Sequence, residues 1–164
     1  MAAKALYAGS FDPVTMGHLD IIERASRMFG HVVVAVGVNP KKPGLFTTEE
    51  RVALLTASCK GIRNITIKSF SGLTADFAAQ EKCSVLVRGL RDAQDFGFEM
   101  QMAHMNHHLT ASLETVFIPC LQQYSSVSSS LVKEVVFLLG KDGGKIKGLV
   151  PAVVEKALLK KFKK

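Results

Sequence analysis

A run of five apolar residues, Val32-Val33-Val34-Ala35-Val36, constrains the fold of this chain more than any other segment. Its β-branched side chains favour a strand, and the absence of alternating polar residues indicates burial on both faces. Sheets that are buried on both faces are typically parallel sheets whose strands are joined by helices. We therefore expect this run to lie in the interior of an α/β fold.

The remaining segments alternate in a pattern that agrees with a parallel sheet. Apolar residues recur at helical spacing between residues 17 and 29, and Thr47 with Glu50 has the pattern of a capping box at a helix start. The order of segments predicts a doubly wound, Rossmann-like α/β fold, with a five-stranded parallel sheet and helices on both faces. The predicted strands cover residues 4–7, 31–38, 64–70, 84–88 and 113–118, and the predicted helices cover 17–29, 47–59, 73–80, 92–108, 128–140 and a segment from about 151.

The bulk composition is that of an ordinary globular protein. The chain has 164 residues, of which 48% are hydrophobic and 21% charged, which predicts a single domain over residues 1–164. We expect a cytoplasmic protein that does not enter a membrane, because neither a long apolar run nor a signal-peptide pattern is present. The three cysteines form no CxxC pair, so we expect reduced, buried thiols.

The formal net charge of +7 raises the possibility of a nucleic-acid partner. Four of the lysines lie in a short basic tail over residues 160–164, which predicts a solvated, frayed end. The chain has no Trp and two Tyr, so it offers few aromatic side chains on which bases could stack. We expect no nucleic-acid partner, and the remaining charge suits small anionic substrates.

The first motif with chemical content follows the first predicted strand. Gly9 allows close backbone approach to a ligand, and Gly17-His18 opens a helix whose N-terminus favours an anion. Ser10 and His18 can donate hydrogen bonds to a phosphate there, and the helix dipole favours a neutral His18 imidazole. The alternative is that Gly9 and Pro13 only shape a turn and that His18 has no chemical role.

A second motif, Ser128-Ser129-Ser130, follows the fifth predicted strand at a helix start. Hydroxyl and backbone N–H groups at such a position bind anions, although an ordinary serine cap would have the same sequence. Both motifs fall at the carboxyl edge of the predicted sheet, where doubly wound folds bind ligands. This coincidence favours a phosphate-binding site.

Basic residues follow other strands at the same predicted edge. Arg88 ends an apolar strand, where an unpaired charge is costly, so we expect a ligand or a carboxylate partner. Arg91 follows it closely, and arginine can hold a phosphate through two parallel hydrogen bonds. Lys42 lies in another loop, where it is either a phosphate ligand or a solvated lysine.

Two segments carry a resemblance to known proteins. Thr15-Met16-Gly17-His18 and residues 127–133 resemble the (H/T)xGH and ISSTxx(R/K) signatures of the nucleotidyltransferase superfamily. Further segments are similar to the bacterial phosphopantetheine adenylyltransferase family, and the likeness extends from about Ala5 to Leu158. These segments are residues 7–13, 41–43, 46–51, 87–91, 95–99 and 102–106.

The resemblance implies transfer of AMP from ATP to 4′-phosphopantetheine, directly and in line, to give dephospho-coenzyme A and pyrophosphate. It makes His18 and Ser10 catalytic, with His18 stabilising the transition state. It also implies Mg²⁺ carried with ATP rather than held by a protein metal site, and a homohexamer. It places ATP at Ser10, Phe11, His18, Gly89, Leu90, Arg91, Glu99, Tyr124, Ser125, Ser126, Val127, Ser128, Ser129 and Ser130, and phosphopantetheine at Ser10, Lys42, Thr74 and Arg88.

Two questions stay open at this point. Nucleotidyltransferases that use a nicotinate or nicotinamide mononucleotide or a polyol phosphate share the Gly-His and serine motifs, but are not expected to share residues 88–91 and 99–106 together. On the predicted helix 92–108, His104 and His108 have a spacing that can bind a metal. A methionine-rich helix face is better explained as a core or subunit contact.

Overall fold

Five parallel strands form the centre of the molecule in the order β3-β2-β1-β4-β5, as the computed structural model shows. The structure describes residues 2–39, 41, 43–139 and 143–162. The predicted doubly wound sheet is confirmed, and strand order reverses between β1 and β4. The strands are β1 (Lys4–Gly9), β2 (His31–Val38), β3 (Ile65–Ser71), β4 (Val85–Leu90) and β5 (Glu114–Pro119).

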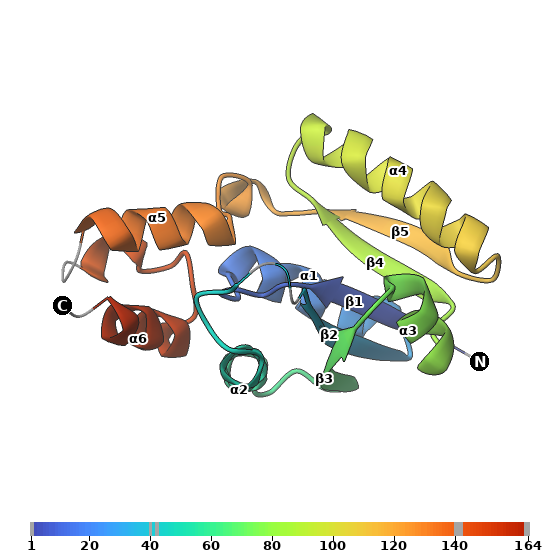
Figure 1. Ribbon diagram of the computed structural model, residues 1–164, viewed down its shortest axis with the longest axis horizontal. Helices are drawn as coiled ribbons and strands as arrows, with labels where there is room; N and C mark the ends of the chain where they lie inside the picture. The colour runs from blue at the N-terminus through green and yellow to red at the C-terminus, as the bar shows by residue number, and fades with distance from the viewer. Residues whose placement is uncertain (1, 40, 42, 140–142, 163–164) are drawn as a thin grey trace.

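Helices cover both faces of this sheet, as Figure 1 shows. Alternate residues of β1 enter two separate cores. Ala5 and Tyr7 pack with residues of α1, α2, α5 and α6, whereas Leu6 and Ala8 pack with residues of α3. The helices are α1 (Met16–Met28), α2 (Thr48–Ser58), α3 (Thr74–Gln80), α4 (Ala93–Leu109), α5 (Ser129–Leu139) and α6 (Ala152–Lys161), with the short 3-10 helices η1 (Gln122–Tyr124) and η2 (Gly143–Ile146).

The predicted boundaries differ from the observed ones mainly at prolines and short helices. Pro119 was expected to follow the last strand, but it is the final residue of β5. Because β5 is an edge strand, the N–H that proline lacks is tolerated there. Pro151 is the N-cap of α6 rather than a residue of its first turn. The short helices η1 and η2 were not predicted, because three or four residues carry no periodic pattern.

The C-terminal part of the chain is built into the same core as α1. Val154 and Leu158 of α6 are fully buried in it. The Met16 N–H, in the first turn of α1, donates a hydrogen bond to the Leu149 carbonyl oxygen at 2.9 Å. The end of the chain therefore helps to hold the start of α1.

The expected frayed tail starts later than predicted. Lys160 and Lys161 form the last turn of α6. Lys161 Nζ lies 2.9 Å from a Glu50 carboxylate oxygen and 5.4 Å from the centre of the Phe46 ring. An ion pair and a cation–π contact thus order this part of the tail, while residues 163 and 164 lie outside the described residues.

The cysteine expectation is confirmed in part. Cys59 and Cys83 are buried and Cys120 is half-buried, and all three are free thiols. Within the described residues, no helix is both long enough and apolar enough to span a bilayer.

Candidate active site

A cleft of about 310 Å³ opens at the carboxyl ends of β1 and β4, where the strand order reverses. This is the position at which doubly wound sheets bind ligands, because loops from the two halves of the sheet diverge there. Its walls come from the ends of both strands, from the first two turns of α1 and α4, from the connection between β5 and α5, and from the first turn of α5. The lining residues are Tyr7, Ala8, Gly9, Thr15, Gly17, His18, Ile21, Arg88, Gly89, Arg91, Asp95, Glu99, Cys120, Tyr124, Val127, Ser128, Ser129 and Ser130.

His18 lines the cleft in the first turn of α1 and is part of a capping box. The Thr15 hydroxyl oxygen accepts from the His18 backbone N–H at 3.3 Å, and the Thr15 backbone N–H donates to His18 Nδ1 at 3.0 Å. Because Nδ1 accepts this bond, the proton of a neutral imidazole is on Nε2. Thr15 therefore selects the tautomer that presents an N–H donor at Nε2.

The His18 imidazole is held neutral. Burial, together with the nearby positive charge of Arg91, lowers its pKa to about 4. The sequence predicted a neutral imidazole because of the helix dipole, whereas the main cause in the structure is burial of the ring. A neutral donor suits an oxygen whose charge changes during a reaction.

Phe11 lies beneath His18 rather than in the cleft wall. Its side chain is 1% exposed, and its ring packs edge-on against the His18 ring with centroids 5.1 Å apart. A Cβ added at Gly9 would lie 3.3 Å from the Phe11 ring. Gly9 therefore makes room for Phe11, a use that differs from the expected approach of a ligand.

Arg88, at the end of β4, is held by a carboxylate as predicted. Its Nε and Nη2 donate to Glu99 Oε2 and Oε1 at 2.5 and 3.1 Å. Its Nη1 also donates to the Ala8 carbonyl oxygen of β1 at 3.0 Å. Two parallel hydrogen bonds fix the plane of the guanidinium at the mouth of the cleft.

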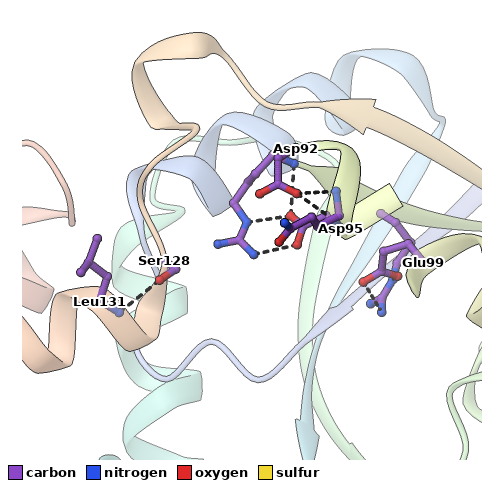
Figure 2. Close-up of polar contacts among 8 residues, drawn as sticks. Asp92, Asp95, Glu99, Ser128 and Leu131 are labelled. Carbon is purple, nitrogen blue, oxygen red and sulfur yellow. Dashed lines mark hydrogen bonds and ion pairs between the residues drawn. The ribbon is translucent and has the colours of Figure 1, made fainter. Parts of the chain in front are cut away.

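A second arginine–carboxylate pair joins Arg91, which follows β4, to Asp95 in the first turn of α4. Asp95 and the cap residue Asp92 are labelled in Figure 2. Arg91 Nε and Nη2 donate to the two Asp95 oxygens at 2.8 and 2.9 Å, and this pairing raises the pKa of Arg91. Asp92 caps α4 by accepting from the N–H groups of Gln94 and Asp95, each at 2.8 Å. The start of α4 therefore holds both arginines through Asp95 and Glu99, which are one turn apart.

The serine motif forms the opposite wall at the start of α5. The Ser128 hydroxyl oxygen accepts from the Leu131 N–H at 3.1 Å (Figure 2), which confirms Ser128 as a cap. The Ser129 hydroxyl donates to the Pro13 carbonyl oxygen at 2.8 Å and ties this helix to the turn after β1. Two helix N-termini thus face one cleft, an arrangement that favours a multiply charged anion.

Some residues expected at the site are not among the described residues that line the cleft. Thr74 begins α3, on the face of the sheet opposite α1, and Lys42 lies outside the described residues. The described side chains that line the cleft do not include Ser10, Phe11, Leu90, Ser125 or Ser126. Their roles at the site stay predictions.

Sequence reasoning missed other residues of the cleft. Asp95 had a usable signal, because a carboxylate in the first turn of a helix, four residues after Arg91, can form an ion pair with it. Thr15 had one as well, as a threonine directly before a predicted helix. Tyr7, Ile21 and Cys120 had none, because strand and core residues of this kind resemble any others.

The described side chains include no group of three or more His, Cys, Asp or Glu arranged to hold a metal ion. On α4, His107 Nδ1 lies 3.9 Å from a Glu114 carboxylate oxygen. Within the described residues, His104 and His108 therefore belong to no such metal-binding group.

Comparison with known proteins first defines the class. The model of the cytidylyltransferase-like family matches residues 6–135, so the chain belongs to that family. A structure described as a nicotinate-nucleotide adenylyltransferase from Vibrio parahaemolyticus aligns over 97% of this chain and 99% of its own, with a TM-score of 0.67 at 21% identity. A lipopolysaccharide core biosynthesis protein from Thermoplasma volcanium GSS1 aligns over 74% of this chain and 99% of its own, with a TM-score of 0.55 at 17% identity. At these identities the two structures show a shared fold.

Curated relatives then define the family more closely. The chain is 51% identical to a phosphopantetheine adenylyltransferase of Synechococcus sp. (strain JA-2-3B'a(2-13)), over 96% of this chain and 97% of that protein. It is 48% identical to the enzyme of the same name from Clostridium novyi (strain NT), over 98% of this chain and 97% of that protein. The chain belongs to the phosphopantetheine adenylyltransferase family.

Proposed function

We propose that the protein transfers AMP from MgATP to 4′-phosphopantetheine, giving dephospho-coenzyme A and pyrophosphate during coenzyme A synthesis in the cytoplasm. The observation that carries this proposal is the convergence of two helix N-termini and two arginines on one cleft. Such a site suits a reaction in which both substrates and both products carry phosphate. Membership of the family supports 4′-phosphopantetheine as the acceptor.

The reaction needs little from the protein in the way of proton transfer. An anionic oxygen of the acceptor phosphate attacks the α-phosphorus of ATP, and the bond from that phosphorus to the β-phosphate bridging oxygen breaks. The electron pair leaves with pyrophosphate. The protein must therefore align the two phosphates and neutralise charge, which preorganised donors do well.

His18 is the proposed donor to the reacting phosphoryl group. Its neutral imidazole presents the Nε2 proton, because Nδ1 is occupied by the Thr15 N–H. A hydrogen bond from Nε2 to an α-phosphoryl oxygen strengthens as charge redistributes in the transition state. His18 acts in this way as a stabiliser and not as a nucleophile.

The two walls of the cleft are proposed to take the two substrates. The serine wall of α5, with Arg91 opposite, suits the ATP phosphates, and Mg²⁺ arrives with them. Arg88 is assigned to the acceptor phosphate, together with Ser10 and Lys42 from the family resemblance. The same resemblance assigns Thr74 to the pantetheine arm of the acceptor. Glu99 contributes by fixing Arg88 through the paired hydrogen bonds.

The test is a panel of acceptors incubated with the protein, Mg²⁺ and labelled ATP. We expect dephospho-coenzyme A and pyrophosphate from 4′-phosphopantetheine. Pantetheine without its phosphate should give no product, since the attacking oxygen is missing. A preference for nicotinamide mononucleotide over phosphopantetheine would overturn the proposal.

We also propose a homo-oligomer, with the hexamer of the family as the expected form. The outer face of α4 supports this, because it exposes large apolar side chains such as Phe98, Met105 and Leu109 at 61, 54 and 47%. Apolar patches of this kind mark protein interfaces. Light scattering after gel filtration gives the mass, and a monomer would contradict the proposal.

A further inference from the structure

Asp12, in the turn between β1 and α1, is a buried carboxylate with 6% of its surface exposed. It is not among the described residues that line the cleft. Both of its carboxylate oxygens nevertheless accept hydrogen bonds. Oδ1 accepts from the Phe46 N–H at 2.9 Å, and Oδ2 accepts from the Leu45 N–H at 2.9 Å and from Lys133 Nζ at 3.0 Å.

Asp12 and these partners lie in three separate segments around the cleft. Leu45 and Phe46 belong to the connection between β2 and α2, which also carries Lys42. Lys133 lies in α5, the helix whose first residues form the serine wall. Asp12 itself follows Phe11, whose ring packs against His18.

We infer that Asp12 is a positioning residue, whose single carboxylate holds the turn before α1, the segment of Leu45 and Phe46, and the helix α5 in one arrangement. This inference rests on the proposed function, which assigns the acceptor to Lys42, in the connection between β2 and α2, and ATP to the start of α5. Asp12 acts through these segments and touches neither substrate.

Neighbouring contacts hold the same turn from both sides. The Ser10 carbonyl oxygen accepts from Arg51 Nη1 of α2 at 3.2 Å, and the Pro13 carbonyl oxygen accepts from the Ser129 hydroxyl of α5 at 2.8 Å. Space next to the carboxylate is tight, because a Cβ added at Gly44 would lie 3.2 Å from Asp12 Oδ2. A shift of any one segment must therefore be accommodated at the carboxylate.

The charge of Asp12 matters to this arrangement. Burial alone would raise its pKa, but the hydrogen bonds from Phe46, Leu45 and Lys133 outweigh burial and bring the pKa below its ordinary value. Hydrogen bonds to a charged acceptor are stronger than neutral ones. A neutral side chain of the same shape would lose this advantage at every partner.

The experiment compares Asp12→Asn with a matched control, Glu81→Gln. Asparagine keeps the size but places an NH₂ group against a donor and removes the charge that faces Lys133. Glu81, which follows α3, is also a largely shielded carboxylate, with 11% of its side chain exposed, and it pairs with Lys68 at 2.7 Å and with Lys4 at 3.7 Å. Both variants should lose stability, which thermal unfolding measures.

Only the Asp12 variant should change the kinetics. We expect its kcat to fall on the order of a hundred-fold, the scale for a displacement of about 1 Å at a reacting centre, with a higher KM for both substrates. Glu81→Gln should keep the kcat and both KM values of the unmodified protein. An Asp12→Asn protein with unchanged kcat and KM would overturn the inference.

A second variant, Lys133→Met, removes the ion pair with Asp12 and leaves the two hydrogen bonds from the Leu45 and Phe46 N–H groups to Asp12. It should raise the KM for ATP and leave the KM for the acceptor unchanged, because only the contact between Asp12 and α5 is lost. An unchanged KM for ATP would refute the coupling to α5. This variant carries the test by itself if Asp12→Asn does not fold.

Hydrogen exchange separates this inference from the proposed function. If the unmodified protein makes no product, the proposed function fails, and the inference is then judged on amide exchange alone. Asp12→Asn should speed exchange in residues 43–47 and 128–133 together, while Glu81→Gln should not. Faster exchange confined to residues 10–13 would overturn the inference.

Discussion

Replacing His18 separates its two roles, because one ring nitrogen supports the helix and the other faces the cleft. Nδ1 accepts the Thr15 N–H at 3.0 Å, and Nε2 carries the proton proposed to bind the phosphoryl group. His18→Asn keeps an acceptor two bonds from Cβ, as Nδ1 is, but it ends short of the Nε2 position. His18→Ala removes both groups.

The expected magnitudes follow from these contacts. Loss of one preorganised donor costs about 2.7–4 kcal/mol, which is roughly a hundred- to a thousand-fold in kcat. Both variants should show this loss, while the KM for ATP changes little, because the donor acts mainly in the transition state. His18→Ala should also lose about 1 kcal/mol of stability with the capping contact, and His18→Asn should lose less.

Steady-state kinetics and urea unfolding measure the two effects separately. The course of transfer is read with ATP that is chiral at the α-phosphorus, where direct transfer gives net inversion. The reasoning is refuted if His18→Asn keeps the kcat of the unmodified protein. It is also refuted by net retention, or by AMP trapped on residue 18, since both indicate a covalent intermediate.

Further outcomes follow from other contacts. Because the folded-state pKa of His18, about 4, is below its ordinary 6.5, its contribution to stability is complete above pH 6.5 and is lost as the pH falls toward 4. The loss in unfolding free energy is about 3 kcal/mol, and in His18→Asn the midpoint of urea unfolding should depend less on pH over this range. Arg88→Ala should lower kcat/KM for the acceptor by an amount equivalent to about 1.5–3 kcal/mol. It should lower the free energy of unfolding by a larger amount, because Glu99 loses its partner. Normal kinetics at low acceptor concentration would show that Arg88 is not part of the site. Lys42→Ala should raise the KM of the acceptor with little change in thermal unfolding, and an unchanged KM would argue for a solvated lysine. Lys82 is exposed with a φ of 55°, so Lys82→Gly should stabilise the protein by about 0.5–1 kcal/mol in urea unfolding, and a loss of stability would contradict this.

The fold was predictable because its signals are local. The apolar run at residues 32–36 indicated a strand buried on both faces, and it lies in β2, next to the central strand. The capping box of Thr47 and Glu50 is present as predicted. Such patterns depend on periodicity within one element, which a single sequence displays.

The site was predictable in position but not in its pairings. Arg88 was expected to have a carboxylate partner, yet the choice of Glu99 depends on how α4 packs against β4. The capping box of Thr15 and His18 at the start of α1 was not predicted, because histidine stands at the N3 position, where Glu or Gln is usual. Asp12 and Lys133 are 121 residues apart, and no local pattern joins them.

The bond between Met16 and Leu149 has a consequence for the order in which this enzyme is completed. At a synthesis rate of ~5–20 residues per second, about 7–27 s separate the appearance of these two residues on the ribosome. Throughout that time the first turn of α1 lacks one of its backbone partners and the packing of α6. The nascent chain can therefore assemble much of its sheet early, but the first turn of α1 becomes complete only after nearly the whole protein has been made.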